Sequence, residues 1–125
     1  MSGGLLVLMG SGELAPPMVG THREALARAG DRGAVMLDGP FGFQDNADQL
    51  CERIVEFFRV SLGVEMGVAS LRRPDASALE RERMLRAVQG AGLVFSGPGS
   101  PSYALRVWAA TGLDELMRAK LAGDG

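Results

Sequence analysis

Short apolar runs alternate with longer amphipathic stretches along the chain. Continuous apolar runs that are bounded by glycine or turn residues are typical of strands buried on both faces. The order of the two kinds of segment predicts an α/β fold of three layers, in which helices cover both faces of a mostly parallel sheet of about four strands. The runs expected as strands are Leu5–Met9, Ala34–Leu37, Val64–Ala69 and Leu93–Phe95.

Helix starts are marked by polar residues at capping positions. Thr21 and Ser77 each precede a glutamate by three residues, which is the spacing of a capping box. Asn46 with Gln49 is a weaker version of the same signal. A helix is therefore expected from about residue 47 to 62, and its apolar stripe would dock on the sheet. The stripe consists of Leu50, Cys51, Ile54, Phe57, Phe58 and Leu62.

Two further helices are expected at about residues 101–110 and 114–121. The second is followed by Gly123-Asp124-Gly125, which reads as a helix C-cap that leads into a further element. An α/β chain that finishes on a helix would ordinarily continue into another strand. We therefore expect residues 1–125 to form one α/β domain that is incomplete at its C-terminal end.

The composition limits the classes of partner that the protein is expected to bind. The 125 residues suffice for one domain, and 46% hydrophobic against 22% charged residues predicts a packed core. A net charge of -2, from 13 basic and 15 acidic residues, provides no field that would attract nucleic acid or an anionic membrane. We expect a soluble, cytoplasmic protein for three reasons. The sequence has one cysteine, it has no basic leader region, and its initial apolar run is too short to span a bilayer.

Ligands of open parallel sheets bind at the carboxyl ends of the strands, so the loops that follow the strands are the first candidates. The first loop, Gly10-Ser11-Gly12-Glu13-Leu14-Ala15, formally fits a dinucleotide fingerprint, with Asp38 as a ribose ligand. Pro16 and Pro17 separate these glycines from the helix cap expected at Thr21, so the helix N-terminus is displaced from the loop. A tight turn is the favoured interpretation, and a nucleotide site is the alternative.

The loop after the last expected strand is Ser96-Gly97-Pro98-Gly99-Ser100-Pro101. Its glycines allow close approach of the backbone to a ligand, and Ser100 with Pro101 suits an N-cap and first helical position, whose amides can face an anion. From these residues alone, a cap is the favoured role of Ser100. Arg72 and Arg73, after the third expected strand, read as a solvated loop, with anion binding as the alternative.

Catalytic signatures are absent from the sequence. It contains no Gly-x-Ser-x-Gly elbow. His22 is the sole histidine and is expected to be exposed in a first helical turn, so a dyad of His22 with Ser100 is disfavoured. Cys51 falls on the apolar stripe and reads as a small core residue. With one histidine and one cysteine, no metal site of ordinary spacing and no cofactor are expected.

Two segments carry a resemblance to a known family. Leu6-Val7-Leu8-Met9-Gly10-Ser11-Gly12-Glu13 resembles the opening of the dipeptidase E and cyanophycinase hydrolases, which share a flavodoxin-like, class I glutamine amidotransferase-like fold. The segment from Val94 to Leu105 is similar to the family's Gly-Gly-Gly-Asn loop and the helix after it. The order of elements agrees along essentially the whole chain. Pro40-Phe41-Gly42-Phe43-Gln44 resembles a bacterial amidotransferase-like subgroup.

The resemblance implies a serine-type peptidase or amidohydrolase that cleaves a peptide-like amide bond. It implies an oxyanion-hole amide from Gly97 or Gly99, since Pro98 has no amide hydrogen, while Ser100 stands where the family often has asparagine. The family's nucleophilic serine and its histidine come later, beyond Gly125. The chain is therefore expected to be the N-terminal portion of such a hydrolase and to be inactive alone, with no catalytic residue of its own.

Two other functions remain open. The residues Gly10, Ser11, Gly12, Glu13, Gly97, Gly99 and Ser100 can instead bind a small ligand or nucleotide without catalysis. Alternatively, an exposed edge at Leu93–Phe95 can pair with another chain and give homo-oligomers. A small peptide-like substrate, and neither nucleic acid nor a membrane, is the partner expected of intact relatives.

Overall fold

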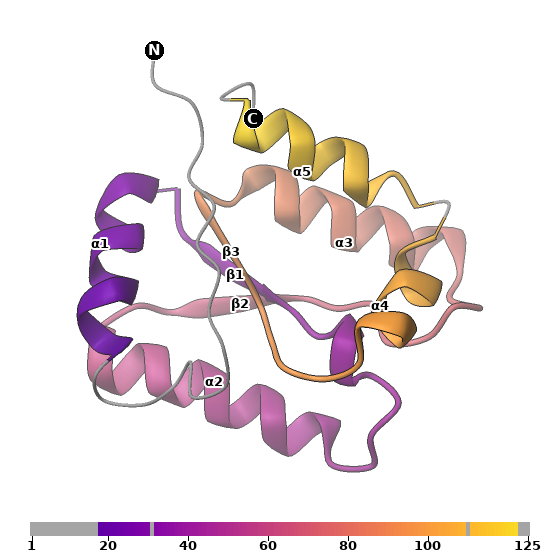
Figure 1. Cartoon of the computed structure of the whole chain (residues 1–125), viewed down its shortest axis with the longest axis horizontal. Helices are drawn as coiled ribbons and strands as arrows, with labels where there is room; N and C mark the ends of the chain where they lie inside the picture. Colours follow the sequence, from indigo (N-terminus) through magenta and orange to yellow (C-terminus); the bar gives the residue numbers. More distant parts are fainter. Residues whose placement is uncertain (1–17, 31, 110, 123–125) are drawn as a thin grey trace.

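The computed structural model describes residues 18–30, 32–109 and 111–122 (Figure 1). Helices and strands alternate along most of this range, as the pattern of apolar runs predicts. The elements in order are α1 (Val19–Ala29), β1 (Ala34–Leu37), the 3-10 helix η2 (Gly39–Phe41), α2 (Ala47–Leu62), β2 (Met66–Ala69), α3 (Ala78–Gly90), β3 (Leu93–Ser96), α4 (Pro101–Trp108) and α5 (Leu113–Leu121).

The three strands form a parallel sheet in the order β2-β1-β3. Leu37 at the end of β1 lies opposite Ala69 of β2 and Ser96 of β3, so the three strands end at the same level. An α/β architecture with a parallel sheet is thereby confirmed. The strand expected at Leu5–Met9 and the C-cap expected at residues 123–125 lie outside the described residues.

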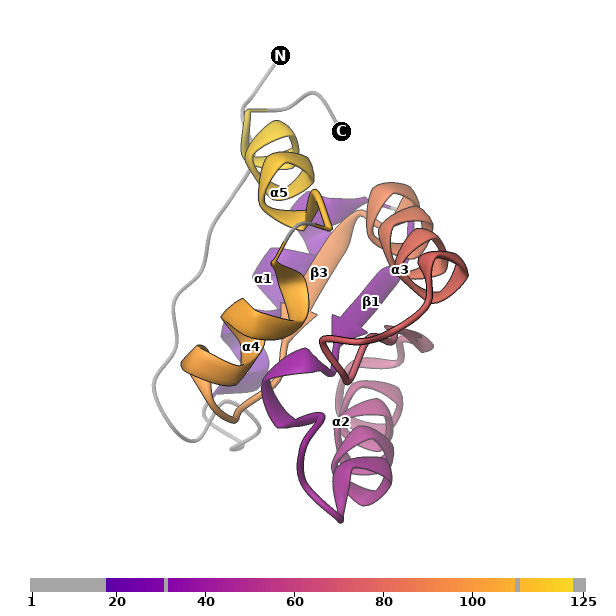
Figure 2. The ribbon, with the colours of Figure 1, turned by 90° about the vertical axis from the view of Figure 1, so that its right-hand side faces the viewer.

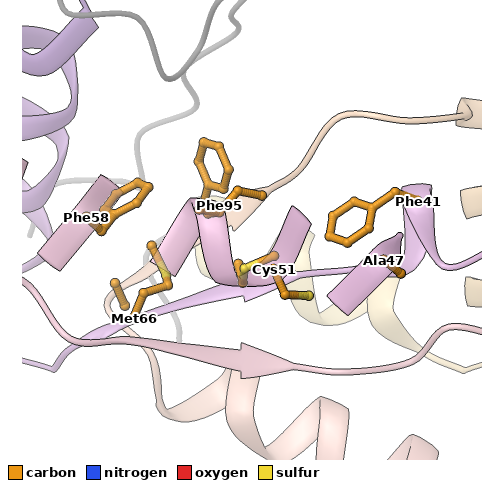
Figure 3. Packing of buried hydrophobic residues seen from close by; sticks show 9 residues of the cluster. Phe41, Ala47, Cys51, Phe58, Met66 and Phe95 are labelled. Atoms are coloured by element: carbon orange, nitrogen blue, oxygen red, sulfur yellow. The ribbon is translucent and has the colours of Figure 1, made fainter. Parts of the chain in front are cut away.

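Helices cover both faces of the sheet, and Figure 1 shows α2 on one side with α3 and α5 on the other. Side chains alternate between the two faces along a strand, so Met36 of β1 packs in one core cluster and its neighbour Leu37 in the other. The first cluster is drawn in Figure 3. Its buried members are Ala34, Met36, Phe41, Ala47, Cys51, Ile54, Phe58, Met66 and Phe95.

The apolar stripe predicted for residues 47–62 is confirmed. Cys51, Ile54 and Phe58 are buried, and the other three members of the stripe are partly buried against the same cluster. The opposite cluster joins the sheet to α3, α4 and α5 through Leu37, Ala69, Leu71, Ala76, Met84, Val88, Val107 and Leu113. In Figure 2, α4 lies beyond the end of the sheet, where it packs against η2.

The capping predictions had mixed outcomes. Ser77 forms the expected box, since its Oγ accepts from the Glu80 amide at 3.1 Å and its own amide donates to the Glu80 carboxylate at 3.2 Å. Asn46 precedes α2, but its side chain makes no capping hydrogen bond. The box at Thr21 was wrong, because α1 already begins at Val19. Packing of a helix face outweighs one local cap, which is worth about 1 kcal/mol.

Candidate functional site

The loops that follow the three strands meet at the carboxyl edge of the sheet. The Ser100 amide donates to the Pro40 carbonyl at 2.8 Å, and the Gly97 amide makes a longer bond of 3.4 Å to the Leu37 carbonyl. These two bonds attach the loop after β3, which we call the glycine loop (residues 97–100), to the end of β1 and the loop after it. The parallel register thus brings the candidate residues of the described part together.

Asp38, the first residue after β1, is the buried polar centre of this edge. Its side chain is 0% exposed. One carboxylate oxygen accepts from Ser70 Oγ at 2.6 Å and Arg72 Nε at 2.8 Å, and the other accepts from the Leu71 amide at 2.9 Å. A carboxylate removed from water requires such partners. Asp38 is therefore engaged within the protein, which disfavours the alternative role as a ribose ligand.

Arg72 also contacts two helices, α2 and α4. Its Nη1 lies 2.7 Å from a carboxylate oxygen of Asp48, its Nη2 lies 3.5 Å from Cys51 Sγ, and its backbone carbonyl accepts from Tyr103 Oη at 2.6 Å. The hydrogen bond to Asp38 is the main cause that raises the pKa of Arg72. The expectation of a solvated loop was therefore wrong for Arg72.

Arg73 has the predicted solvated environment, with a side chain that is 69% exposed. The charges around Arg72 also bear on the alternative of anion binding. Asp38 and Asp48 both pair with this one guanidinium, so the three groups together carry one net negative charge. This balance disfavours Arg72 as an anion-binding residue.

The backbone amides of the glycine loop differ in their hydrogen bonds to the rest of the described structure. Ser100 is the N-cap of α4, as predicted, because its Oγ accepts from the Tyr103 amide at 3.1 Å. The amides of Gly97 and Ser100 are already used in the bonds to Leu37 and Pro40. Gly99 is exposed, and within the described part of the chain its amide makes no hydrogen bond. Of the predicted oxyanion donors, Gly99 is the one left for a ligand.

Glycine is required where these loops touch. A Cβ on Gly99 would lie 2.2 Å from the Pro40 carbonyl oxygen, and the φ of Gly99 is +136°. A Cβ on Gly97 would lie 2.6 Å from the Phe41 ring. The loops therefore approach each other more closely than any residue with a side chain allows.

Cys51 and His22 both lie in the core. Cys51 is 8% exposed, and burial, followed by the charge of Asp38, raises the pKa of its thiol, as suits a packing residue. His22 is 3% exposed, so the expectation of an exposed histidine was wrong. Its ring packs edge-on against aromatic rings of α2 and β3, which bury that face of α1. The three rings belong to Phe57, Phe58 and Phe95.

Gly10, Ser11, Gly12 and Glu13 lie outside the described residues. Among residues 18–30, 32–109 and 111–122, no group of three or more His, Cys, Asp or Glu is arranged to hold a metal ion. No helix in those ranges has both the length and the apolar character needed to cross a bilayer. Comparison of the chain with protein-family models, curated proteins and solved structures found no match.

Replacing Arg72 with methionine should destabilise the protein. Arg72→Met leaves the buried Asp38 carboxylate without its cation, and we expect the free energy of unfolding to fall by about 2–3 kcal/mol, somewhat below the cost for a fully buried pair because water reaches Arg72. Urea denaturation followed by circular dichroism measures the change. Arg73→Met is the matched control and should cost under about 0.5 kcal/mol. Equal effects of the two variants would contradict the role of Arg72.

A methyl group at position 99 should separate the loops. Gly99→Ala introduces both a backbone strain and a contact with Pro40, and we expect a loss of about 2 kcal/mol or more in the free energy of unfolding. Gly90→Ala at the end of α3 is the control, since a Cβ there meets nothing within 4 Å; it should be neutral or stabilise by up to about 1 kcal/mol. A Gly99→Ala protein as stable as the parent in thermal unfolding would rule out the close approach.

Proposed function

We propose that the chain provides the substrate-binding and oxyanion side of a serine-type peptidase or amidohydrolase-like protein related to dipeptidase E and cyanophycinase. The observation that carries the proposal is the fixed position of Gly99 at the carboxyl edge. Gly97 and Ser100 in the same loop donate their amides to Leu37 of β1 and to Pro40 after it, while Gly99 is exposed and its amide forms no hydrogen bond with another described residue. A donor held in place before the reaction is what stabilises a developing oxyanion.

The start of α4 adds to this donor. Pro101 is the first residue of α4 and Ser100 is its cap, so the partial positive charge of the helix N-terminus lies directly after Gly99. A carbonyl oxygen that accepts from the Gly99 amide would also lie in this field. Both effects strengthen as negative charge develops on that oxygen.

The proposed fold is the flavodoxin-like, class I glutamine amidotransferase-like one. The parallel order β2-β1-β3 with helices on both faces is compatible with that proposal. In such sheets the ligand lies outside the carboxyl ends of the strands, which is where the glycine loop, Asp38 and Arg72 are found.

Ser100 is not proposed as the nucleophile. Its Oγ accepts the Tyr103 amide as a helix cap, and His22 is packed among the rings of α2 and β3. Catalysis by a serine needs a base in hydrogen-bond reach that removes the hydroxyl proton. We therefore expect the 125-residue chain to bind a peptide-like ligand without cleaving it.

The engagement of Ser100 as a cap also favours a second candidate, a small-ligand-binding module without catalysis. The two functions differ in what the Gly99 amide recognises. An oxyanion donor depends on the carbonyl oxygen of the scissile amide, whereas a simple anion site depends on a ligand carboxylate. Nucleotides are a third class of ligand that the same titration can include.

Amide NMR tests the proposal on the intact chain. An aspartyl dipeptide should shift the Gly99 amide resonance saturably and leave Gly90 unchanged, and its isostere with CH2–NH in place of the amide should shift Gly99 far less. A fluorophosphonate probe should label no serine stoichiometrically. Equal shifts with both ligands would favour the simple binding module, and no shift at residues 97–100, or stoichiometric serine labelling, would overturn the proposal.

A further inference from the structure

An exposed aromatic and cationic cluster lies beside the glycine loop. We call Phe43, Tyr103 and Arg106 the Tyr103 cluster. Phe43 is 54% exposed, and its ring centre lies 5.0 Å from that of Tyr103 at an interplanar angle of 60°. The Arg106 guanidinium carbon lies 5.8 Å from the same ring centre. One tyrosine ring therefore contacts both an exposed apolar ring and an exposed cation.

The Tyr103 cluster is attached to the proposed site at two points. Tyr103 donates its hydroxyl to the Arg72 carbonyl at 2.6 Å and its amide to Ser100 Oγ at 3.1 Å, so the ring is held between the loop after β2 and the glycine loop. Phe43 lies three residues after Pro40, and the Pro40 carbonyl accepts a hydrogen bond from the Ser100 amide. The Tyr103 cluster is therefore attached to the loop that contains Gly99.

Arg106 differs from Arg72 in its charge balance. Arg72 pairs with two carboxylates, whereas Arg106 is exposed and forms no ion pair with any residue that the structure describes. A guanidinium without a carboxylate is complementary to a ligand carboxylate, which it can bind in a bidentate manner. An exposed phenylalanine ring is complementary to an apolar or aromatic group. Both requirements are met by an aromatic residue with a free carboxylate.

We propose that the Tyr103 cluster binds the C-terminal residue of a short peptide, with an aromatic side chain against Phe43 and the terminal carboxylate on Arg106. The inference rests on the proposed function, because it places the amide carbonyl of that peptide toward Gly99. It assigns a substrate class: dipeptide-like molecules that end in an aromatic residue with a free carboxylate.

Ligand pairs that differ in one group test the inference. Asp-Phe should bind the intact chain about tenfold more tightly than Asp-Ala and than Asp-Phe amide, as measured by NMR titration. Phe43→Ala should abolish the preference for Phe over Ala, and Arg106→Gln should abolish the preference for the free carboxylate. Leu79→Ala and Arg83→Gln, at exposed positions of α3, are matched controls that should leave both preferences intact.

The outcomes separate this inference from the proposed function. Equal affinities for the three ligands, with a saturable shift at Gly99, would overturn the Tyr103 cluster as a specificity site and leave the proposed function standing. Preferences that survive in Phe43→Ala and Arg106→Gln would likewise overturn the inference. Preferences that depend on these two residues, without any shift at Gly99, would support the cluster and count against the oxyanion role.

Discussion

The buried carboxylate of Asp38 is the constraint on which the carboxyl edge depends. It follows β1 directly, has no exposed surface and accepts from Ser70, Leu71 and Arg72, all of which follow β2. A charge in that position is tolerated only when donors surround it. Because the Arg72 carbonyl in turn accepts from Tyr103, the same network reaches α4. The loops after two strands and the helix after the third are thus held by one group.

The glycine loop packs against the residues that follow β1, close to the Asp38 network. Its residues lie so close to the loop after β1 that side chains at Gly97 and Gly99 would overlap with Phe41 and Pro40. Two of its amides maintain this contact, and the amide of Gly99 forms no hydrogen bond with another residue that the structure describes. The proposed oxyanion role and the proposed peptide specificity of the Tyr103 cluster both depend on this fixed geometry. Neither requires a catalytic side chain from the described residues.

Local signals predicted the elements well and the site only in part. β1 and α2 could be predicted because a continuous apolar run and a helical stripe are local patterns, and the caps at Ser77 and Ser100 act within one turn. The partnership of Asp38 with Arg72 spans 34 residues and exists only in the folded sheet. The available signal was a charged residue directly after β1 and a second one three positions after the end of β2. The burial of His22 was missed because it depends on aromatic rings of α2 and β3, which are distant in the sequence.

A double-mutant cycle with Asp38→Asn and Arg72→Met measures the central interaction most directly. Free energies of unfolding of the parent, both single variants and the double variant give the coupling between the two side chains. If the Asp38 network holds the carboxyl edge together, the coupling energy should be about 2 kcal/mol. Effects that add to within about 0.5 kcal/mol would contradict it, because the two groups would then contribute to stability independently.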